Sequence, residues 1–379
     1  MKNLNPSHPL FISSLLVSTL ALVGCSSGSS NNAKSSNSPT PNKPTPASSV
    51  PPTPTPNQPS PASTVAPTPT PTPNQPNPSP APASSPSSTT PSAPTTPTTP
   101  TTPSTPSSPS TPQTVQFNNS QTGEAINAVW YPPVYDGKPK AVVVALHGCG
   151  GLWSSSTTQP QKLSQRYREY VAQFQQQGFG VLLPDSFTLR NLTNVCQTTY
   201  DTRQLTTSER AGDATGALKW LASQPYIDMS HVGLVGWSNG ATTSLRVRLQ
   251  QAKATDPTQP NFASTAVFYP GCASIASKNA SLGKAPLLIQ IGADDDWTPA
   301  KDCEQLLSQR QLAGEPFELK IYPNSYHGFD SNDPVKVRLD VPNGVNGETA
   351  GVHQGGNPVT NAQAKAELDA FLRRTLIAN

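Results

Sequence analysis

The fold is decided by residues 231–240, which read HVGLVGWSNG. Residues 232–235 are apolar, as in a buried strand, and the stretch after Asn239 is suited to a helix. In a tight turn between a strand and a helix, side chains two residues before and after the central serine would collide with both elements, and glycine stands at both places. The pattern predicts that Ser238 is exposed at a helix N-terminus, which favours developing negative charge. An ordinary tight turn is the alternative.

Short apolar runs alternate with longer amphipathic runs on both sides of this turn. The short runs show little apolar-polar alternation, which favours strands covered on both faces, as in a parallel sheet. The expected strands are 141–146, 179–183, 232–235, 265–269, 287–291 and 317–322, and the expected helices are 161–177, 208–223, 239–251, 301–312 and 361–377. Two earlier runs, 114–118 and 125–131, would add antiparallel strands at one edge. The sequence therefore predicts an α/β fold with a mainly parallel central sheet and helices on both faces.

The first 25 residues have the layout of a secretory signal. A short cationic start precedes an apolar run over residues 10–23, and a bilayer span needs about 20 apolar residues. The run ends in Leu-Val-Gly-Cys at Cys25, which resembles a bacterial lipobox and implies cleavage before Cys25 and its acylation. An ordinary signal peptide or an uncleaved membrane helix is the alternative. We expect a signal peptide over 1–24, a lipid anchor at Cys25, and export to the bacterial cell envelope, where Ser26 points to the outer membrane.

Residues 25–113 carry the anchor cysteine and then a tract of Pro, Ser, Thr, Ala and Asn. More than half of the chain's 45 prolines lie there, with few large apolar side chains. Such a tract cannot offset the entropy of ordering, so we predict a disordered spacer or a glycosylated stalk. Residues 114–379 are long enough for one large core and form the expected folded domain. The net charge of +3, with no basic run, argues against nucleic acid as a partner.

A serine hydroxyl needs a base to become a good nucleophile, and histidine serves best near neutral pH. Of the 5 histidines, His327 follows the last expected strand, where a loop can bring it over Ser238. We prefer it to His353, which lies in a long Gly-rich loop and could line the substrate entrance. The base needs a carboxylate, and the chain order Ser, Asp, His points to the three adjacent aspartates at 294–296. The residues alone do not choose among the three.

The stretch HGCGG at residues 147–151 follows the first long central strand. Its small residues leave backbone N–H groups free to point at an oxyanion, which acyl transfer requires. We assign this oxyanion hole to the N–H groups of Cys149 and Asn239, and we interpret His147 as a hydrogen-bonded structural residue. This chemistry needs neither a metal ion nor an organic cofactor.

Four cysteines besides Cys25 fit a chain sent to an oxidising compartment. They allow three pairings, and free buried thiols are a further alternative. We prefer Cys149 with Cys196 and Cys272 with Cys303, because each pair would join neighbouring loops of the expected fold.

Together these motifs resemble the dienelactone hydrolase branch of the α/β-hydrolases, from the edge strands to the last helix. The residues that carry the resemblance are HGCGG at 147–151, Asp185-Ser186-Phe187, GWSNG at 236–240, Gly292-x-x-Asp295-x-x-x-Pro299 with Trp297, and His327-Gly328-Phe329. The resemblance implies the α/β-hydrolase fold, and the family's spacing of the acid selects Asp295. The chain departs from the family at two places. Dienelactone hydrolases proper have a cysteine where this chain has Ser238, and a glutamate near the oxyanion loop where it has His147.

The sequence thus predicts a serine hydrolase that cleaves carboxylic esters through an acyl-enzyme on Ser238. Its expected substrate is a small ester or lactone, with Phe187 and Trp297 as candidates for the pocket wall. A peptidase or a polyester depolymerase could use the same residues. A surface binding module that kept the fold and lost the activity is the alternative outside the enzymes. Such a module would be expected to lack a member of the triad, and none is missing.

Overall fold

The computed structural model describes residues 111–156 and 161–377. The expected signal peptide, the expected anchor Cys25 and almost all of the expected linker lie outside these residues. Within the described ranges, no helix is both long and apolar enough to cross a bilayer.

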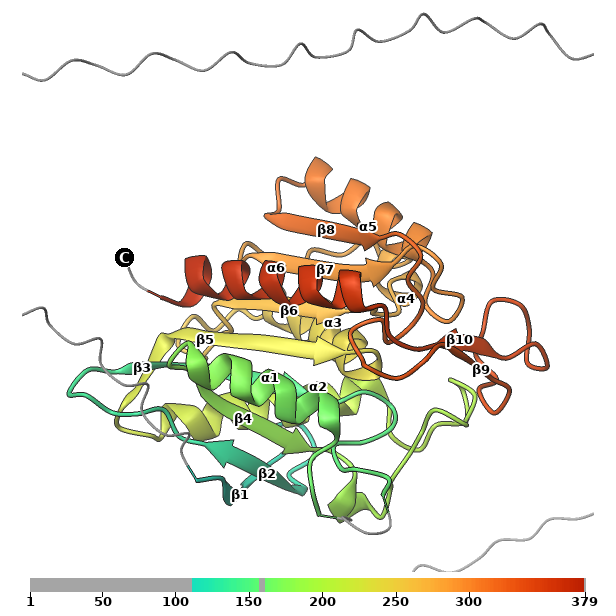
Figure 1. Cartoon of the computed structure of the whole chain (residues 1–379). Coiled ribbons are helices and arrows are strands. Elements are labelled where there is room, and N and C mark those ends of the chain that lie inside the picture. The colour runs from blue at the N-terminus through green and yellow to red at the C-terminus, as the bar shows by residue number, and fades with distance from the viewer. Residues whose placement is uncertain (1–110, 157–160, 378–379) are drawn as a thin grey trace, which may run out of the picture. The chain divides into compact units, whose positions relative to one another are not determined.

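An eight-stranded sheet organises the domain, with its strands in the order β1-β2-β4-β3-β5-β6-β7-β8 (Figure 1). The strands are β1 Gln113–Asn118, β2 Ala125–Tyr131, β3 Lys140–Leu146, β4 Gly180–Asp185, β5 Ile227–Trp237, β6 Ser264–Phe268, β7 Leu287–Gly292 and β8 Phe317–Tyr322. The pairs β1–β2 and β2–β4 are antiparallel, and all pairs from β4 to β8 are parallel. The α/β fold with an antiparallel edge, expected from the sequence, is confirmed.

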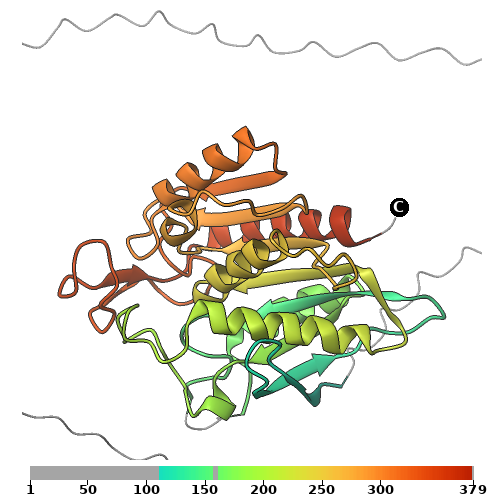
Figure 2. The same cartoon turned by 180° about the vertical axis from the view of Figure 1, so that it is seen from behind.

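Helices cover both faces of this sheet. They are α1 Gln165–Gln176, α2 Thr207–Ala222, α3 Asn239–Gln251, α4 Ala273–Ala276, α5 Ala300–Leu312 and α6 Pro358–Leu376. In Figure 1, α1 and α6 lie in front of the sheet, and Figure 2 shows α2 and α3 on the opposite face. The helix α2 begins with a capping box, in which Thr206 and Glu209 bond each other's backbone N–H.

The central strand β3 shows why the apolar runs lack alternation. Successive side chains of a strand point to opposite faces, so Val142 and Val144 join the core beneath α2, whereas Val143 and Ala145 join the core beneath α1 and α6. None of the four is more than 2% exposed. Because both faces are covered, every position of the strand from Val142 to Leu146 is buried and apolar, and only its start at Lys140 is polar.

The elements that the sequence did not predict are short. Between β8 and α6 the chain makes an excursion over residues 331–357, which carries the antiparallel pair β9 Lys336–Arg338 and β10 Val352–Gln354. A 3-10 turn at Thr188–Arg190 and the short α4 were also missed. Three or four residues are too few for a hydrophobic period, so pattern reasoning has nothing to detect.

Two disulfides lie near the carboxyl ends of the parallel strands. One bond links Cys149, after β3, to Cys196, and the other links Cys272, after β6, to Cys303 on α5. These are the two pairings that the sequence favoured among the possible ones.

Candidate active site

Three side chains from three loops meet beyond the carboxyl ends of the strands. Ser238 follows β5, Asp295 follows β7 and His327 follows β8. The Oγ of Ser238 lies 2.9 Å from Nε2 of His327, and Nδ1 of His327 lies 2.9 Å from Oδ2 of Asp295. Asp295 and His327 are almost fully buried. The structure therefore brings the three expected residues together in the geometry that activation of a serine by a base requires.

The turn that presents Ser238 is held in an uncommon backbone conformation. Its φ of 53° lies in the left-handed region, which residues with a Cβ rarely adopt. A Cβ on Gly240 would lie 2.2 Å from the carbonyl oxygen of Leu146, and a Cβ on Gly236 would lie 2.5 Å from that of Gly240. Backbone contact therefore requires both glycines, as the sequence pattern predicts.

Asp295 is oriented by its own loop. Its Oδ1 accepts the backbone N–H groups of Trp297 and Thr298 at 2.9 and 2.8 Å, and this turns Oδ2 toward His327. The hydroxyl of Thr298 also donates to Oδ2, at 3.0 Å. With four hydrogen-bond partners, the carboxylate has a single orientation, as a group that must hold the imidazole in place requires.

The neighbouring aspartates lie elsewhere. Asp294 is exposed, and Asp296 accepts from Nδ1 of His353 at 2.7 Å and from its backbone N–H at 2.8 Å. The His353 ring also stacks on Tyr326, with ring centroids 4.8 Å apart. His353 therefore forms a separate pair with Asp296, which fastens the 331–357 excursion to the loop of Asp295.

Two backbone N–H groups lie beside Ser238. Cys149 follows β3, Asn239 is the first residue of α3, and both line the same cavity as Ser238. Among the described residues, neither N–H donates to a protein acceptor. Free donors at this position can stabilise an oxyanion, which is the role that the sequence assigns to them.

His147 fixes the direction of one of these donors. The N–H of Cys149 belongs to the peptide whose carbonyl is that of Gly148, and in a trans peptide the two groups point opposite ways. The Gly148 oxygen accepts from His147 Nδ1 at 2.8 Å and from the N–H of Gly151 at 3.2 Å. Since His147 Nε2 accepts the N–H of Ser186 at 3.2 Å, the proton is on Nδ1. The imidazole is therefore neutral and orients the peptide.

Arg210 connects the two sides of the expected oxyanion site. This residue of α2 is 1% exposed and donates to the carbonyl oxygen of His147, at 2.9 Å, and to the side-chain oxygen of Asn239. Burial lowers its pKa to about 10, so the guanidinium stays charged at neutral pH. Arg210 was not predicted, since a lone arginine within an expected helix belongs to no motif.

A buried carboxylate lies behind the three central residues. Asp330 accepts hydrogen bonds from the ring N–H of Trp237 at 3.0 Å and from the hydroxyls of Tyr170 and Tyr269 at 3.0 and 2.7 Å, and it forms an ion pair with Arg166. Burial raises the pKa of both tyrosines well above the usual value, so both remain donors. Trp237 is the last residue of β5 and directly precedes Ser238. Its hydrogen bond to Asp330 therefore holds the end of the strand from which the serine projects. Asp330 belongs to no sequence motif and was not predicted.

The Ser238 hydroxyl opens onto a cavity of about 470 Å³. Its walls come from α3, from the loop before α2, from the loop of Asp295 and from the 331–357 excursion. Residues that line it include Tyr200, Arg203, Thr242, Arg246, Trp297, Asn343 and Val345. Such a volume accommodates a small organic molecule.

Of the two residues expected in the pocket wall, Trp297 lies there and Phe187 does not. Trp297 lines the cavity and packs against the imidazole of His327, with ring centroids 4.5 Å apart. Phe187 is 2% exposed and is not among the lining residues, because its ring packs against His147 at 4.5 Å instead. Within residues 111–156 and 161–377, no cluster of three or more His, Cys, Asp or Glu side chains is placed to hold a metal ion.

Comparison with known proteins places this geometry in a family. The model of the dienelactone hydrolase family matches residues 126–370, more than half of the chain. A Klebsiella pneumoniae protein described as a dienelactone hydrolase superimposes with a TM-score of 0.51 at 13% identity, covering 70% of this chain and 99% of that one. An esterase from Pyrococcus furiosus has a TM-score of 0.46 at 16% identity, covering 70% and 93%. At 13% identity, the Klebsiella structure establishes the fold alone.

The neutral state of His147 has a consequence for stability at acid pH. Burial and the nearby Arg210 lower the pKa of His147 from 6.5 to about 3. The unfolded chain therefore binds one more proton than the folded chain between these values, and folding stability falls as the pH drops below about 6.5, by up to about 1.4 kcal/mol per pH unit. H147Q cannot take up that proton. Between pH 4.5 and 6, its unfolding free energy should therefore change less steeply with pH than that of the wild type, by about 1.4 kcal/mol per pH unit, which corresponds to one proton. Urea unfolding at several pH values measures this, and an unchanged slope would contradict the assignment.

Proposed function

The chain belongs to the dienelactone hydrolase family, whose members are hydrolases, and from this premise we propose that it hydrolyses carboxylic esters or lactones through an acyl-enzyme on Ser238. The observation that carries the proposal is the unbroken series of contacts from Ser238 through His327 to Asp295 at one wall of a cavity. No metal ion or organic cofactor takes part in the proposed steps.

The proposed reaction has two steps. In the first, Ser238 attacks the ester carbonyl while Nε2 of His327 takes the hydroxyl proton, and Asp295 stabilises the resulting imidazolium. The carbonyl oxygen becomes an oxyanion held by the N–H groups of Cys149 and Asn239. Collapse of this intermediate releases the alcohol, which receives the proton from His327, and leaves the acyl group on the serine.

In the second step, water replaces the alcohol. His327 takes a proton from the water, which attacks the acyl carbonyl, and a second oxyanion forms in the same place. Its collapse returns the proton to the Oγ of Ser238 and releases the acid. A surface binding module without activity would have no need for a buried Asp295 with four hydrogen bonds, and this favours the enzyme over that alternative.

The proposal predicts the behaviour of a serine variant. In S238A, turnover of a short-chain nitrophenyl ester should fall by several orders of magnitude. The activity that remains should be the uncatalysed reaction plus the small contribution of the oxyanion hole. Because the side chain is at the surface of the cavity, the unfolding midpoint should change little. S244A, which removes a buried hydroxyl about one and a half turns into α3, is the matched control and should keep turnover. Undiminished turnover by S238A would overturn the proposal.

We also propose that the chain is exported and anchored to the cell envelope through an acylated Cys25. Two disulfides support export, because they persist in oxidising compartments, and the Leu-Val-Gly-Cys motif supports acylation. The tract after Cys25 would act as a spacer, which at about 3.1 Å per residue in an extended proline-rich chain could hold the enzyme well away from the membrane.

A single substitution tests the anchor. Several acyl chains on one cysteine bind a bilayer firmly, since each buried methylene contributes about 0.8 kcal/mol. In cells that process bacterial lipoproteins, the chain should therefore partition into the detergent phase of Triton X-114, and C25A should move to the aqueous phase with its esterase activity per mole intact. If C25A remained in the detergent phase, the anchor would have to lie elsewhere.

A further inference from the structure

The loop that carries one oxyanion donor has a single side chain. In Gly148-Cys149-Gly150-Gly151, three of four residues are glycines, which have more backbone freedom than any other residue. Such a loop needs an outside contact to keep one conformation. Two contacts start at Cys149, whose carbonyl oxygen accepts the N–H of Val195 at 2.8 Å and whose sulfur is bonded to Cys196. The backbone of Gly148 is also held, by Nδ1 of His147 at its carbonyl oxygen and by the hydroxyl of Tyr167, which accepts its N–H at 2.8 Å. At Cys149 itself, the disulfide is the attachment that the side chain makes.

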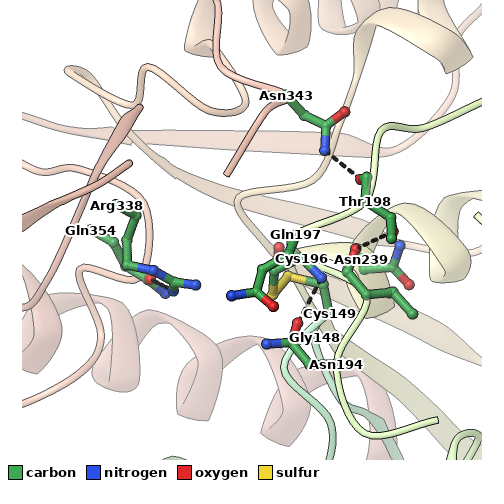
Figure 3. Close-up of a disulfide and its surroundings, with 12 residues drawn as sticks. Gly148, Cys149, Asn194, Cys196, Gln197, Thr198, Asn239, Arg338, Asn343 and Gln354 are labelled. Carbon is green, nitrogen blue, oxygen red and sulfur yellow. Dashed lines mark hydrogen bonds between the residues drawn. A yellow bond between two sulfur atoms is a disulfide. The ribbon is translucent and has the colours of Figure 1, made fainter. Parts of the chain in front are cut away.

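The segment at the other end of the disulfide is itself well held (Figure 3). Cys196 is 5% exposed, and its N–H donates to the side chain of Asn194 at 2.7 Å. The carbonyl oxygen of Thr198 accepts from the amide of Asn343 at 2.8 Å, and the side chain of Gln197 donates to Asp340 at 2.9 Å. The disulfide therefore attaches the oxyanion loop to a fixed segment.

These contacts continue to the loops of the base and the acid. Asn343 and Asp340 lie in the 331–357 excursion, where the N–H of Val345 donates to the carbonyl oxygen of Asp296 at 3.0 Å. Near the end of the excursion, the N–H of Gly355 donates to the carbonyl oxygen of His327 at 3.1 Å. A continuous path thus runs from the Cys149 donor through Cys196 and the excursion to the loops of Asp295 and His327.

We infer that Cys196 is a positioning residue for hydrolysis: its disulfide to Cys149 holds the Cys149 N–H at the place where the oxyanion forms. This inference rests on the proposed function. It follows that the bond acts on the transition state more than on substrate binding, because the donor contacts the oxygen fully only when charge develops there. Loss of the bond should lower kcat and leave KM nearly unchanged.

The second disulfide offers a matched control. Cys272 and Cys303 join the start of α4 to α5, and neither residue lines the cavity or carries a proposed donor. The two bonds close chain segments of similar length, with sequence separations of 47 and 31 residues. Their effects on the unfolded chain should therefore be similar, and only their effects on turnover should differ.

The experiment compares C149S/C196S with C272S/C303S in the full chain, below the unfolding temperature of both. Serine at position 149 keeps the backbone N–H and removes only the bond. We expect kcat for a nitrophenyl ester to fall by about tenfold or more in C149S/C196S, up to the limit of about 10²–10³ that complete loss of one donor causes. The inhibition constant of a trifluoromethyl ketone, whose adduct places an oxyanion in the hole, should rise by a similar factor. In C272S/C303S both quantities should stay within about twofold.

A second measurement covers the case in which the double serine variant does not fold. C272S/C303S retains only the Cys149–Cys196 bond, so dithiothreitol should lower its kcat, and reoxidation should restore it. Unchanged kcat on loss of the Cys149–Cys196 bond, or an equal loss with either bond removed, would overturn the inference while leaving the proposed function intact. A wild-type chain without esterase activity would overturn both.

Discussion

The structure depends on the close approach between the turn at Ser238 and the end of β3. No side chain fits between Gly240 and the carbonyl groups of Leu146 and His147, so the start of α3 rests directly on the backbone that continues into the oxyanion loop. The nucleophile and both oxyanion donors therefore occupy fixed positions relative to one another. The left-handed backbone at Ser238 is tolerated because the parallel strands on either side hold the turn.

Around this contact, buried charged side chains hold the surrounding elements together through hydrogen bonds. Asp330 joins Trp237 and Tyr269 beneath the serine, and Arg210 joins His147 to Asn239 beside it. A buried charge is tolerated only where hydrogen bonds surround it, and such groups fix one arrangement of their partners. The site consequently has little freedom, which is what electrostatic stabilisation of a transition state requires.

The sequence predicted the sheet, its helices and the central triad, because both-face burial produces continuous apolar strands and because the turn at Ser238 admits few residue types. The choice among residues 294–296 needed family spacing, since three adjacent carboxylates are equivalent until a loop orients them. The roles of Asp330 and Arg210 depend on contacts between residues far apart in the chain, and no local pattern reports these. The 331–357 excursion was missed because it follows no period, and Phe187 faces the core because His147 occupies the space beside it.

The central claim is that Ser238 is the residue that becomes acylated. The most direct measurement is treatment of the chain with a fluorophosphonate, which forms a stable adduct with an activated serine, followed by mass spectrometry of its peptides. The account predicts one adduct per chain, on Ser238, and parallel loss of esterase activity. Inactivation with the adduct on another residue, or full activity after Ser238 is modified, would contradict it.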